Sequence, residues 1–394
     1  MKQIITLLIV INLYPVYGQT DSEILDKTIA KLDALTTIRY DVRIVAYSEE
    51  IAGNNGTRSG KAYFDFTNKD TLGGFRYQFV SDSKEQVFNG KQCFNVDFKD
   101  EMVLYKDNPS TYDIYNPILI STSIFEAKVL LPQLIRDNTI VVTRKKDTVI
   151  NTIDCYKFNF LIPDKFIDIN AVLTKLPSPN KKTHLNYQIT ISKKRYLPIE
   201  IKTVSPDNFG SFTATFGNCK TGITKEDSVW SYDRFSDKYA ILEKEQYYKS
   251  KKNKMTNIIG SGAPDFTLPN IDGDMVSLSS FNSQLTLLEF WFPNCGACVI
   301  AVPHINEIQK KYKDKGLKVY GIEYTESSKE NLKSYIIKQN IEFPILYEGK
   351  DVAKSYDAFA APTIYLLNKK KEIVYASIGL KKEDLIKVIN DRLK

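Results

Sequence analysis

The stretch FWFPNCGACVIAVP, residues 290–303, decides how the C-terminal third of the chain folds, because it places Cys295 and Cys298 two residues apart. A zinc site normally needs four protein ligands. No other cysteine follows residue 298, and His304 is the only histidine after residue 263. A disulfide that encloses only two residues removes little conformational entropy from the unfolded chain. We therefore predict no metal site here, and a cysteine pair that carries out redox chemistry.

The residues on either side of the pair alternate between strand and helix patterns. An apolar run, residues 285–292, precedes the cysteines, and residues 298–312 follow with helical spacing. Similar alternation continues to the C-terminus, which predicts an α/β domain with a mainly parallel sheet. The N–H groups at a helix N-terminus would stabilise a thiolate on Cys295, the predicted nucleophile. Cys298, one turn later, would resolve the mixed disulfide that Cys295 forms.

Three segments of the C-terminal third resemble a single family. They are residues 263–281, which match an opening hairpin, residues 285–298, which match the first core strand and cysteine pair, and residues 356–375, which match a strand preceded by proline. The family is that of the TlpA/ResA-type, thioredoxin-like thiol–disulfide proteins of bacterial envelopes. The resemblance implies an α/β thioredoxin fold for residues 263–394. It also implies a protein-disulfide oxidoreductase that needs no cofactor beyond the redox-active disulfide Cys295–Cys298.

The same resemblance predicts a groove for the substrate strand beside the disulfide. Pro362 matches the family's cis-proline, and a cis X–Pro bond is uncommon in folded proteins. Ala361 and Pro362, together with Trp291, are expected to line this groove. Ala361 is small and would leave the groove open to bulky partners. Pro303 matches the proline that kinks the active-site helix.

Glu289 lies six positions before Cys295, inside an apolar strand pattern. The resemblance places a buried acid behind the disulfide at this position. Burial raises the pKa of a carboxyl group towards neutrality. Glu289 could then exchange a proton with Cys298 while the mixed disulfide is released. The alternative is a glutamate that faces solvent on an edge strand.

The sequence departs from the family pattern at several positions. Asn294 replaces a tryptophan, Ala297 replaces a common proline, and Ala301 stands where many members carry a second acid. These changes affect the expected redox potential and the expected partner, but not the expected class of reaction. His304 is expected to lie on the surface of the helix. Peroxiredoxins share the opening residues but need a threonine where this chain has Phe292. Thiol peroxidase activity is therefore a minor alternative.

The first 19 residues predict a secretory signal peptide. Lys2 precedes an apolar run, and a small residue, Gly18, precedes the predicted cleavage site. An uncleaved signal would instead keep the protein associated with a membrane. Export to the periplasm would place the five cysteines in an oxidising space, where disulfides can form.

A different pattern fills residues 20–248. Residues 20–38 predict an amphipathic helix, and residues 39–219 alternate apolar and polar side chains as in an antiparallel β meander with one wet face. Residues 123–137 predict a helical insertion that Pro132 kinks or divides. Together with residues 194–203, this arrangement weakly resembles the LolA/RseB-type half-barrels, which bind acyl chains or exported proteins. The many Phe and Tyr residues could line such a cavity or form an ordinary sheet core.

Three cysteines, Cys93, Cys155 and Cys219, belong to this N-terminal domain. Cys93 and Cys155 fall in strand patterns, so a cross-strand disulfide is one option and buried free thiols are the other. The net charge of the whole chain is +7, but residues 261–394 carry 18 Lys and Arg against 17 Asp and Glu. A basic segment at 249–254 contributes to the excess, and residues 249–262 predict a linker. The charge pattern therefore indicates no nucleic-acid partner.

Taken together, the sequence predicts an exported thiol–disulfide oxidoreductase that reduces disulfides of envelope proteins. Its expected partners are protein clients and a membrane thiol–electron donor, with a client or lipid bound by the N-terminal domain. The alternative is a lipid- or lipoprotein-binding protein whose thioredoxin-like domain is a redox-sensitive appendage.

Overall fold

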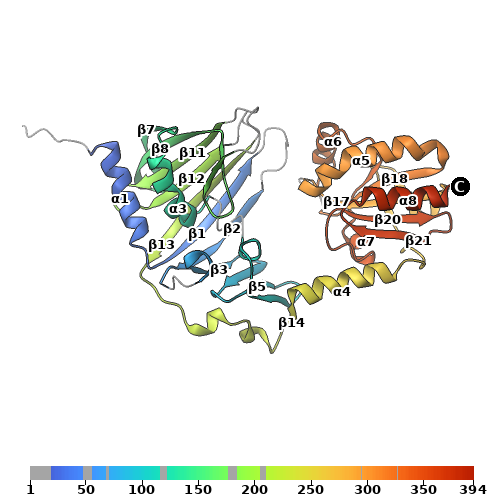
Figure 1. Ribbon diagram of the computed structural model, residues 1–394, viewed down its shortest axis with the longest axis horizontal. Coiled ribbons are helices and arrows are strands. Elements are labelled where there is room, and N and C mark those ends of the chain that lie inside the picture. The colour runs from blue at the N-terminus through green and yellow to red at the C-terminus, as the bar shows by residue number, and fades with distance from the viewer. Residues whose placement is uncertain are drawn as a thin grey trace, which may run out of the picture.

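The protein contains a large β-sheet region and a smaller α/β domain, joined by one helix in this computed structural model (Figure 1). The structure describes residues 19–47, 56–67, 71–115, 122–175, 184–204, 210–293, 295–325 and 327–394. The predicted signal segment, apart from Gln19, and the predicted departure at Asn294 lie outside these residues. Within them, no helix is long and apolar enough to cross a membrane.

A 12-stranded sheet forms the N-terminal region, in the order β14-β6-β5-β4-β3-β2-β1-β13-β12-β11-β8-β7. Neighbouring strands are antiparallel except β14 and β6, which run parallel. The strands are β1 (Thr37–Tyr47), β2 (Thr57–Asp65), β3 (Arg76–Val80), β4 (Lys84–Phe88), β5 (Gln92–Asp97), β6 (Met102–Asp107), β7 (Val141–Ile150), β8 (Ile153–Pro163), β11 (His184–Ser192), β12 (Pro198–Val204), β13 (Ser211–Thr221) and β14 (Ala240–Glu243). A small pair, β9 (Lys165–Ile167) and β10 (Leu173–Lys175), stands apart.

The predicted antiparallel sheet is confirmed, but the chain does not follow one continuous meander. It runs outward from β1 through β2 to β6 on one side, and β7 then begins at the opposite edge. The β13 strand returns to pair with β1 in the middle of the sheet. The LolA-like identity of this region stays a prediction.

Two helices cover one face of this sheet (Figure 1). α1 (Asp21–Asp33) begins with a capping box between Thr20 and Glu23, which fixes its start. The helix predicted for residues 20–38 is too long at its C-terminal end, because β1 already begins at Thr37. α3 (Ile124–Arg136) contains Pro132 within a single helix, so this proline does not divide it.

Aromatic rings fill the space between these helices and the sheet. Phe64 stacks on Phe125 with ring centres 5.8 Å apart, and Phe75 lies 4.5 Å from Phe125. Tyr40 packs edge-on against Phe216 at 5.3 Å. These five rings are 7% exposed or less. Of the two options for the aromatic residues, packing as an ordinary core describes these five.

The three cysteines of this region carry free thiols. Cys93 lies on β5 and Cys155 on β8, with seven strands between them in the sheet. The cross-strand pairing of Cys93 with Cys155 is therefore wrong. Cys219 lies near the end of β13 and is partly exposed.

The C-terminal domain is built on a five-stranded sheet in the order β19-β18-β17-β20-β21. β17, β18 and β19 are parallel, whereas β20 and β21 are antiparallel, so the predicted parallel sheet holds for three strands. The strands are β17 (Leu285–Trp291), β18 (Leu317–Glu323), β19 (Ile345–Leu346), β20 (Thr363–Asn368) and β21 (Ile373–Ile378), and the helices are α5 (Gly296–Tyr312), α6 (Lys329–Lys338), α7 (Lys350–Ser355) and α8 (Lys382–Arg392). A short hairpin, β15 (Thr267–Pro269) and β16 (Met275–Ser277), precedes them. The predicted thioredoxin-like fold is confirmed.

The predicted basic linker is mostly helical, because α4 (Lys244–Asn257) includes its basic residues (Figure 1). Lys244 bonds Asp113 of the N-terminal region at 2.9 Å. Lys251 bonds Asp357 of the C-terminal domain at 2.6 Å, and Lys254 reaches the same carboxylate at 3.2 Å. Ion pairs therefore attach α4 to both parts of the protein.

Candidate active site

Cys295 and Cys298 form a disulfide at the N-terminus of α5. Cys295 is the N-cap residue of this helix, and the backbone N–H of Cys298 donates to its Sγ at 3.2 Å. Both cysteines are buried, with Cys295 7% exposed and Cys298 2% exposed, so Cys295 is the more accessible residue of the pair. A negative charge on the Cys295 sulfur would be stabilised by this N–H group and by the helix dipole.

The predicted groove residues Ala361 and Pro362 lie beside the disulfide. The Ala361–Pro362 peptide bond is cis, as the sequence predicts. The Ala361 carbonyl oxygen lies 3.6 Å from Cys295 Sγ. Pro362 immediately precedes β20, which pairs with β17, and β17 leads to the cysteines. The sheet thus brings together two segments that are 66 residues apart.

Glu289 lies in the middle of β17, every residue of which is buried. Its side chain is 1% exposed, and Oε1 has no hydrogen-bond partner. Burial raises the pKa of this carboxyl group to about 8. Because β17 pairs with β18 on one side and β20 on the other, the alternative of a solvent-facing glutamate on an edge strand is wrong.

Side chains alternate between the two faces of a strand. Leu287 and Trp291 pack in the same cluster as Cys295 and Cys298, so Glu289 faces α5 and the disulfide. This is the placement that the proton-relay prediction requires.

Trp291 is buried more deeply than a groove-lining residue would be. Only 2% of its surface is exposed, and its ring stacks on Tyr335 of α6 at 5.7 Å. The sequence prediction that Trp291 lines the substrate groove is therefore not supported, because its indole lies within the core behind the disulfide. Its position still makes it a fluorescent reporter of the cysteine pair.

The remaining predicted positions on α5 have structural roles. Ala301 lies on the buried face of α5, and Pro303 lies within the helix. His304 is exposed and its Nδ1 lies 3.4 Å from Lys382 Nζ, so it is a surface residue as expected. Val299 and Ile300 follow the disulfide and are 36% and 71% exposed. They give the surface beside Cys295 an apolar character.

Sequence reasoning missed a second buried acid near the pair. Glu323 ends β18, is fully buried, and lies in register with Trp291. The signal was present, because Glu323 interrupts an apolar strand pattern just as Glu289 does. Among the residues that the structure describes, no group of three or more His, Cys, Asp or Glu side chains is arranged to hold a metal ion.

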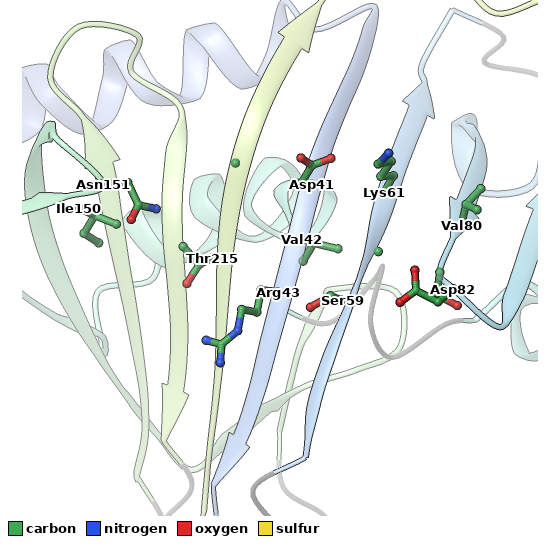
Figure 2. Close-up of a pocket in the computed structure, with 13 residues that line it drawn as sticks. Asp41, Val42, Arg43, Ser59, Lys61, Val80, Asp82, Ile150, Asn151 and Thr215 are labelled. Atoms are coloured by element: carbon green, nitrogen blue, oxygen red, sulfur yellow. The ribbon is translucent and has the colours of Figure 1, made fainter.

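The N-terminal sheet carries a shallow groove of about 710 Å³, lined by charged, polar and apolar residues, on the face opposite α1 and α3 (Figure 2). Asp41 and Lys61 are paired across β1 and β2 in its floor, with Arg43 beside them. Asp82 lies at one side and Asn151 at another. Both signs of charge are present, and no residue predicted to be functional lies there.

Comparison with known proteins finds similarity in the C-terminal third of the chain. Residues 259–376 match the AhpC/TSA family. The thiol–disulfide oxidoreductase ResA of Bacillus cereus is 29% identical over 130 residues, which are 33% of this chain and 73% of the relative. The thioredoxin-like protein YneN of Bacillus subtilis is 33% identical over 122 residues, which are 30% of this chain and 71% of the relative. The crystal structure of a thiol:disulfide interchange protein DsbE, described as putative, from Chlorobium tepidum is 28% identical; the match covers 34% of this chain and 98% of that one, with a TM-score of 0.33.

Proposed function

Because its C-terminal domain belongs to the thioredoxin-like thiol–disulfide oxidoreductases of the ResA/TlpA type, we propose that this enzyme reduces disulfide bonds of exported proteins through Cys295 and Cys298. The observation that carries the proposal is the disulfide at the N-terminus of α5 beside the cis-proline Pro362. A strand of the client would lie along Ala361 and Pro362. The exposed Val299 and Ile300 would add apolar contacts.

The reaction begins with the reduced enzyme. The Cys295 thiolate attacks one sulfur of the client disulfide, forming a mixed disulfide and releasing the other client sulfur as a thiolate, which takes up a proton. Cys298 then loses its proton and attacks Cys295 Sγ. This step breaks the mixed disulfide, releases the second client thiolate, which is also protonated, and forms the Cys295–Cys298 disulfide. The client is reduced by two electrons and the enzyme is oxidised by two.

Glu289 is the proposed proton acceptor for Cys298 in the second step. Desolvation raises the pKa of its carboxyl group to about 8, near the ordinary pKa of a thiol. A base of this strength can take the Cys298 proton and return it to a departing thiolate. The side chain also lies on the face of β17 that packs against α5.

The enzyme would act in the periplasm after its signal segment directs export, and a membrane thiol–electron donor would reduce its disulfide again. An oxidising compartment already forms disulfides, which is why we favour reduction as the direction. The N-terminal region would dock the client. The charged side chains of Asp41, Arg43 and Lys61 in its groove support a protein client more than an acyl chain. The packed aromatic core beneath α3 does not favour a lipid-filled interior.

The decisive experiment is the redox equilibrium of the full chain against glutathione, followed by tryptophan fluorescence. We expect one two-electron transition with a potential near the thioredoxin value of about −270 mV. Cys295→Ser and Cys298→Ser should each abolish it, while Cys219→Ser in the N-terminal region should leave it unchanged. A potential near about −120 mV would reverse the direction and make the protein an oxidant. The absence of any transition would refute the redox function.

A further inference from the structure

The helix α4 contacts the C-terminal domain at the segment that leads to the client groove. Residues 356–362, which we call the prolyl segment, connect α7 to β20. The segment ends beside the disulfide, because the Ala361 carbonyl oxygen lies 3.6 Å from Cys295 Sγ. Asp357 and Ala361 are four residues apart, which limits the distance between them to about 14 Å. A contact at the start of the prolyl segment can therefore influence the part that the client would touch.

Three side chains of α4 are placed to hold this segment. Tyr248, Lys251 and Met255 follow one another at intervals of three and four residues, a spacing that puts them on one face of the helix. Met255 is 3% exposed and packs in the same core cluster as Ala358. The rings of Tyr248 and Phe359 lie with their centres 6.1 Å apart. One face of α4 therefore packs along the first half of the prolyl segment.

Asp357 lies close to two lysines of α4. Lys251 Nζ donates to Asp357 Oδ1 at 2.6 Å, and Lys254 Nζ lies 3.2 Å from Oδ2. The Asp357 side chain is only 15% exposed. Burial by itself raises the pKa of this carboxyl group, but the hydrogen bonds and positive charges of the two lysines outweigh that effect and hold the pKa below its ordinary value. The attraction to α4 therefore more than compensates for the loss of water around the carboxylate.

Asp357 also forms the turn that directs the prolyl segment. Its φ is 54°, in the left-handed region that Asp and Asn adopt more readily than most other residues with a side chain. Its backbone N–H donates to the carbonyl oxygen of Lys354 at 3.0 Å, and the N–H of Phe359 donates to its own carbonyl oxygen at 3.0 Å. This turn sets the direction in which the chain leaves α7. A bond that holds the Asp357 side chain therefore also holds the course of the residues that follow.

The opposite end of α4 is fixed to the N-terminal region. Lys244 lies 2.9 Å from Asp113, and Lys106 lies 3.1 Å from Asp113 and 2.7 Å from Glu245. These four side chains, two cationic and two anionic, join β6 and the residues that follow it to the first turn of α4. The helix is thus held at both ends, and its contact with the prolyl segment is not made by a freely moving linker.

We infer that Lys251 is a positioning residue for client binding: through its ion pair with Asp357, it holds the prolyl segment where the segment receives the client strand. Tyr248 adds to this contact through Phe359. The inference rests on the proposed function, because it concerns the groove beside the same cysteine pair. A client binds only those molecules in which the prolyl segment is in place, so a weaker contact with α4 raises the concentration of client that is needed. The chemistry at the sulfur atoms requires no contact with α4.

The test compares KM and kcat of the full chain for insulin, a protein that contains disulfides, with dithiothreitol as electron donor. In Lys251→Met, the KM for insulin should rise about two- to five-fold, the upper value being the whole contribution of one half-buried ion pair. The kcat should stay within about two-fold of the wild type, because the sulfur atoms and their surroundings are unchanged. Lys251→Arg keeps the positive charge and should restore the wild-type KM. The exposed Lys249→Met, on the same helix, is the matched control and should change neither constant.

A second substitution removes the charge from the other side of the pair. Asp357→Asn keeps a residue that tolerates the left-handed backbone and should also raise the KM for insulin. Because Lys251 acts through Asp357, the double variant should raise KM no further than the larger single effect. If the two effects multiply instead, Lys251 acts at another place and the inference is overturned. Tyr248→Ala, at a side chain that is 44% exposed, covers the case in which these variants do not fold, and its KM should rise as well.

The remaining outcomes separate this inference from the proposed function. If the wild type reduces neither insulin nor hydroxyethyl disulfide, the proposed function fails and the inference fails with it. If the wild type reduces insulin but the variants that fold keep its KM, the prolyl segment does not depend on α4 and only the inference is overturned. Hydroxyethyl disulfide has no peptide strand to lie in the groove. If Lys251→Met impairs its reduction as much as that of insulin, α4 supports the whole domain rather than the prolyl segment, which also overturns the inference.

Discussion

At the scale of single residues, the N-terminal region contains a buried acid of its own. Glu126 on α3 is 3% exposed, and burial raises the pKa of its carboxyl group to about 8. The unfolded chain releases this proton near pH 4.5, whereas the folded protein keeps it up to about pH 8. The contribution of Glu126 to stability is therefore fully present below pH 4.5, is lost as the pH rises through this window, and does not change further above it.

The direction of this pH dependence gives a prediction for the Glu126→Gln variant. The free energy of unfolding of the N-terminal region should fall less steeply with pH in the variant than in the wild type, by roughly 1.4 kcal/mol per pH unit between pH 5 and 7. Urea denaturation at several pH values measures the difference. The exposed Glu383→Gln serves as control and should keep the wild-type slope; an equal slope in all three proteins would show that Glu126 ionises normally.

Single residues also show which parts of the candidate site the sequence can predict. Cys295, Cys298, Glu289 and Pro362 were predicted from spacing and resemblance, because each stands at a fixed distance from the strand that carries it. Trp291 was misplaced, because its direction depends on Gly321 of a neighbouring strand, which leaves space for the indole. Such a contact between distant segments has no signature in the local pattern.

At the scale of elements, α4 is held by ion pairs as well as by the buried side chain of Met255, which packs in the core of the C-terminal domain. Lys251→Met removes a half-buried ion pair with Asp357 while keeping the apolar stem of the side chain. We expect the free energy needed to detach α4 locally from the C-terminal domain to fall by about 0.5–1 kcal/mol. Hydrogen exchange of the α4 amides should accelerate by about two- to five-fold relative to the wild type, and this difference should shrink at high salt, which weakens the ion pair in the wild type.

The matched control for this prediction is Lys354→Met. Lys354 pairs with Asp351 at 3.7 Å on the surface of the C-terminal domain, where both side chains are well exposed. Exchange of the α4 amides should not change in this variant. Equal acceleration in both variants would mean that net charge, and not the contact with Asp357, holds the helix.

Helices and strands were predicted well where the hydrophobic pattern is strongly periodic. Features that depend on the order of strands in the sheet were predicted poorly. The alternating pattern of residues 39–219 gave the antiparallel strands, but not the return of β13 to the centre of the sheet, since strand order depends on long-range pairing. The unbroken course of α3 through Pro132 also depends on tertiary packing, which outweighs the local effect of proline.

At the scale of the whole molecule, the two parts should unfold as separate units. Phe125→Ala would remove a ring that packs between Phe64 and Phe75. The expected loss is roughly 3–5 kcal/mol in the N-terminal region. Calorimetry should show one transition at lower temperature and the other unmoved, and the redox transition of Cys295–Cys298 at 25 °C should be retained.

The control is Phe212→Ala, because Phe212 is 54% exposed. This variant should stay within about 0.5 kcal/mol of the wild type. If Phe125→Ala shifts both transitions together, the two parts unfold cooperatively and α4 transmits stability between them. If neither transition shifts, the aromatic cluster does not contribute to the core.

The parallel pairing of β14 with β6 has a mechanical consequence. β14 ends at Glu243 and α4 begins at the next residue, so a pull on the C-terminal domain passes along α4 into β14. The backbone hydrogen bonds to β6 and the ion pair between Lys244 and Asp113 then carry the load together. A client held by the cysteines at one end and by the sheet at the other would therefore exert its tension on this short strand before any force reached the core of the sheet.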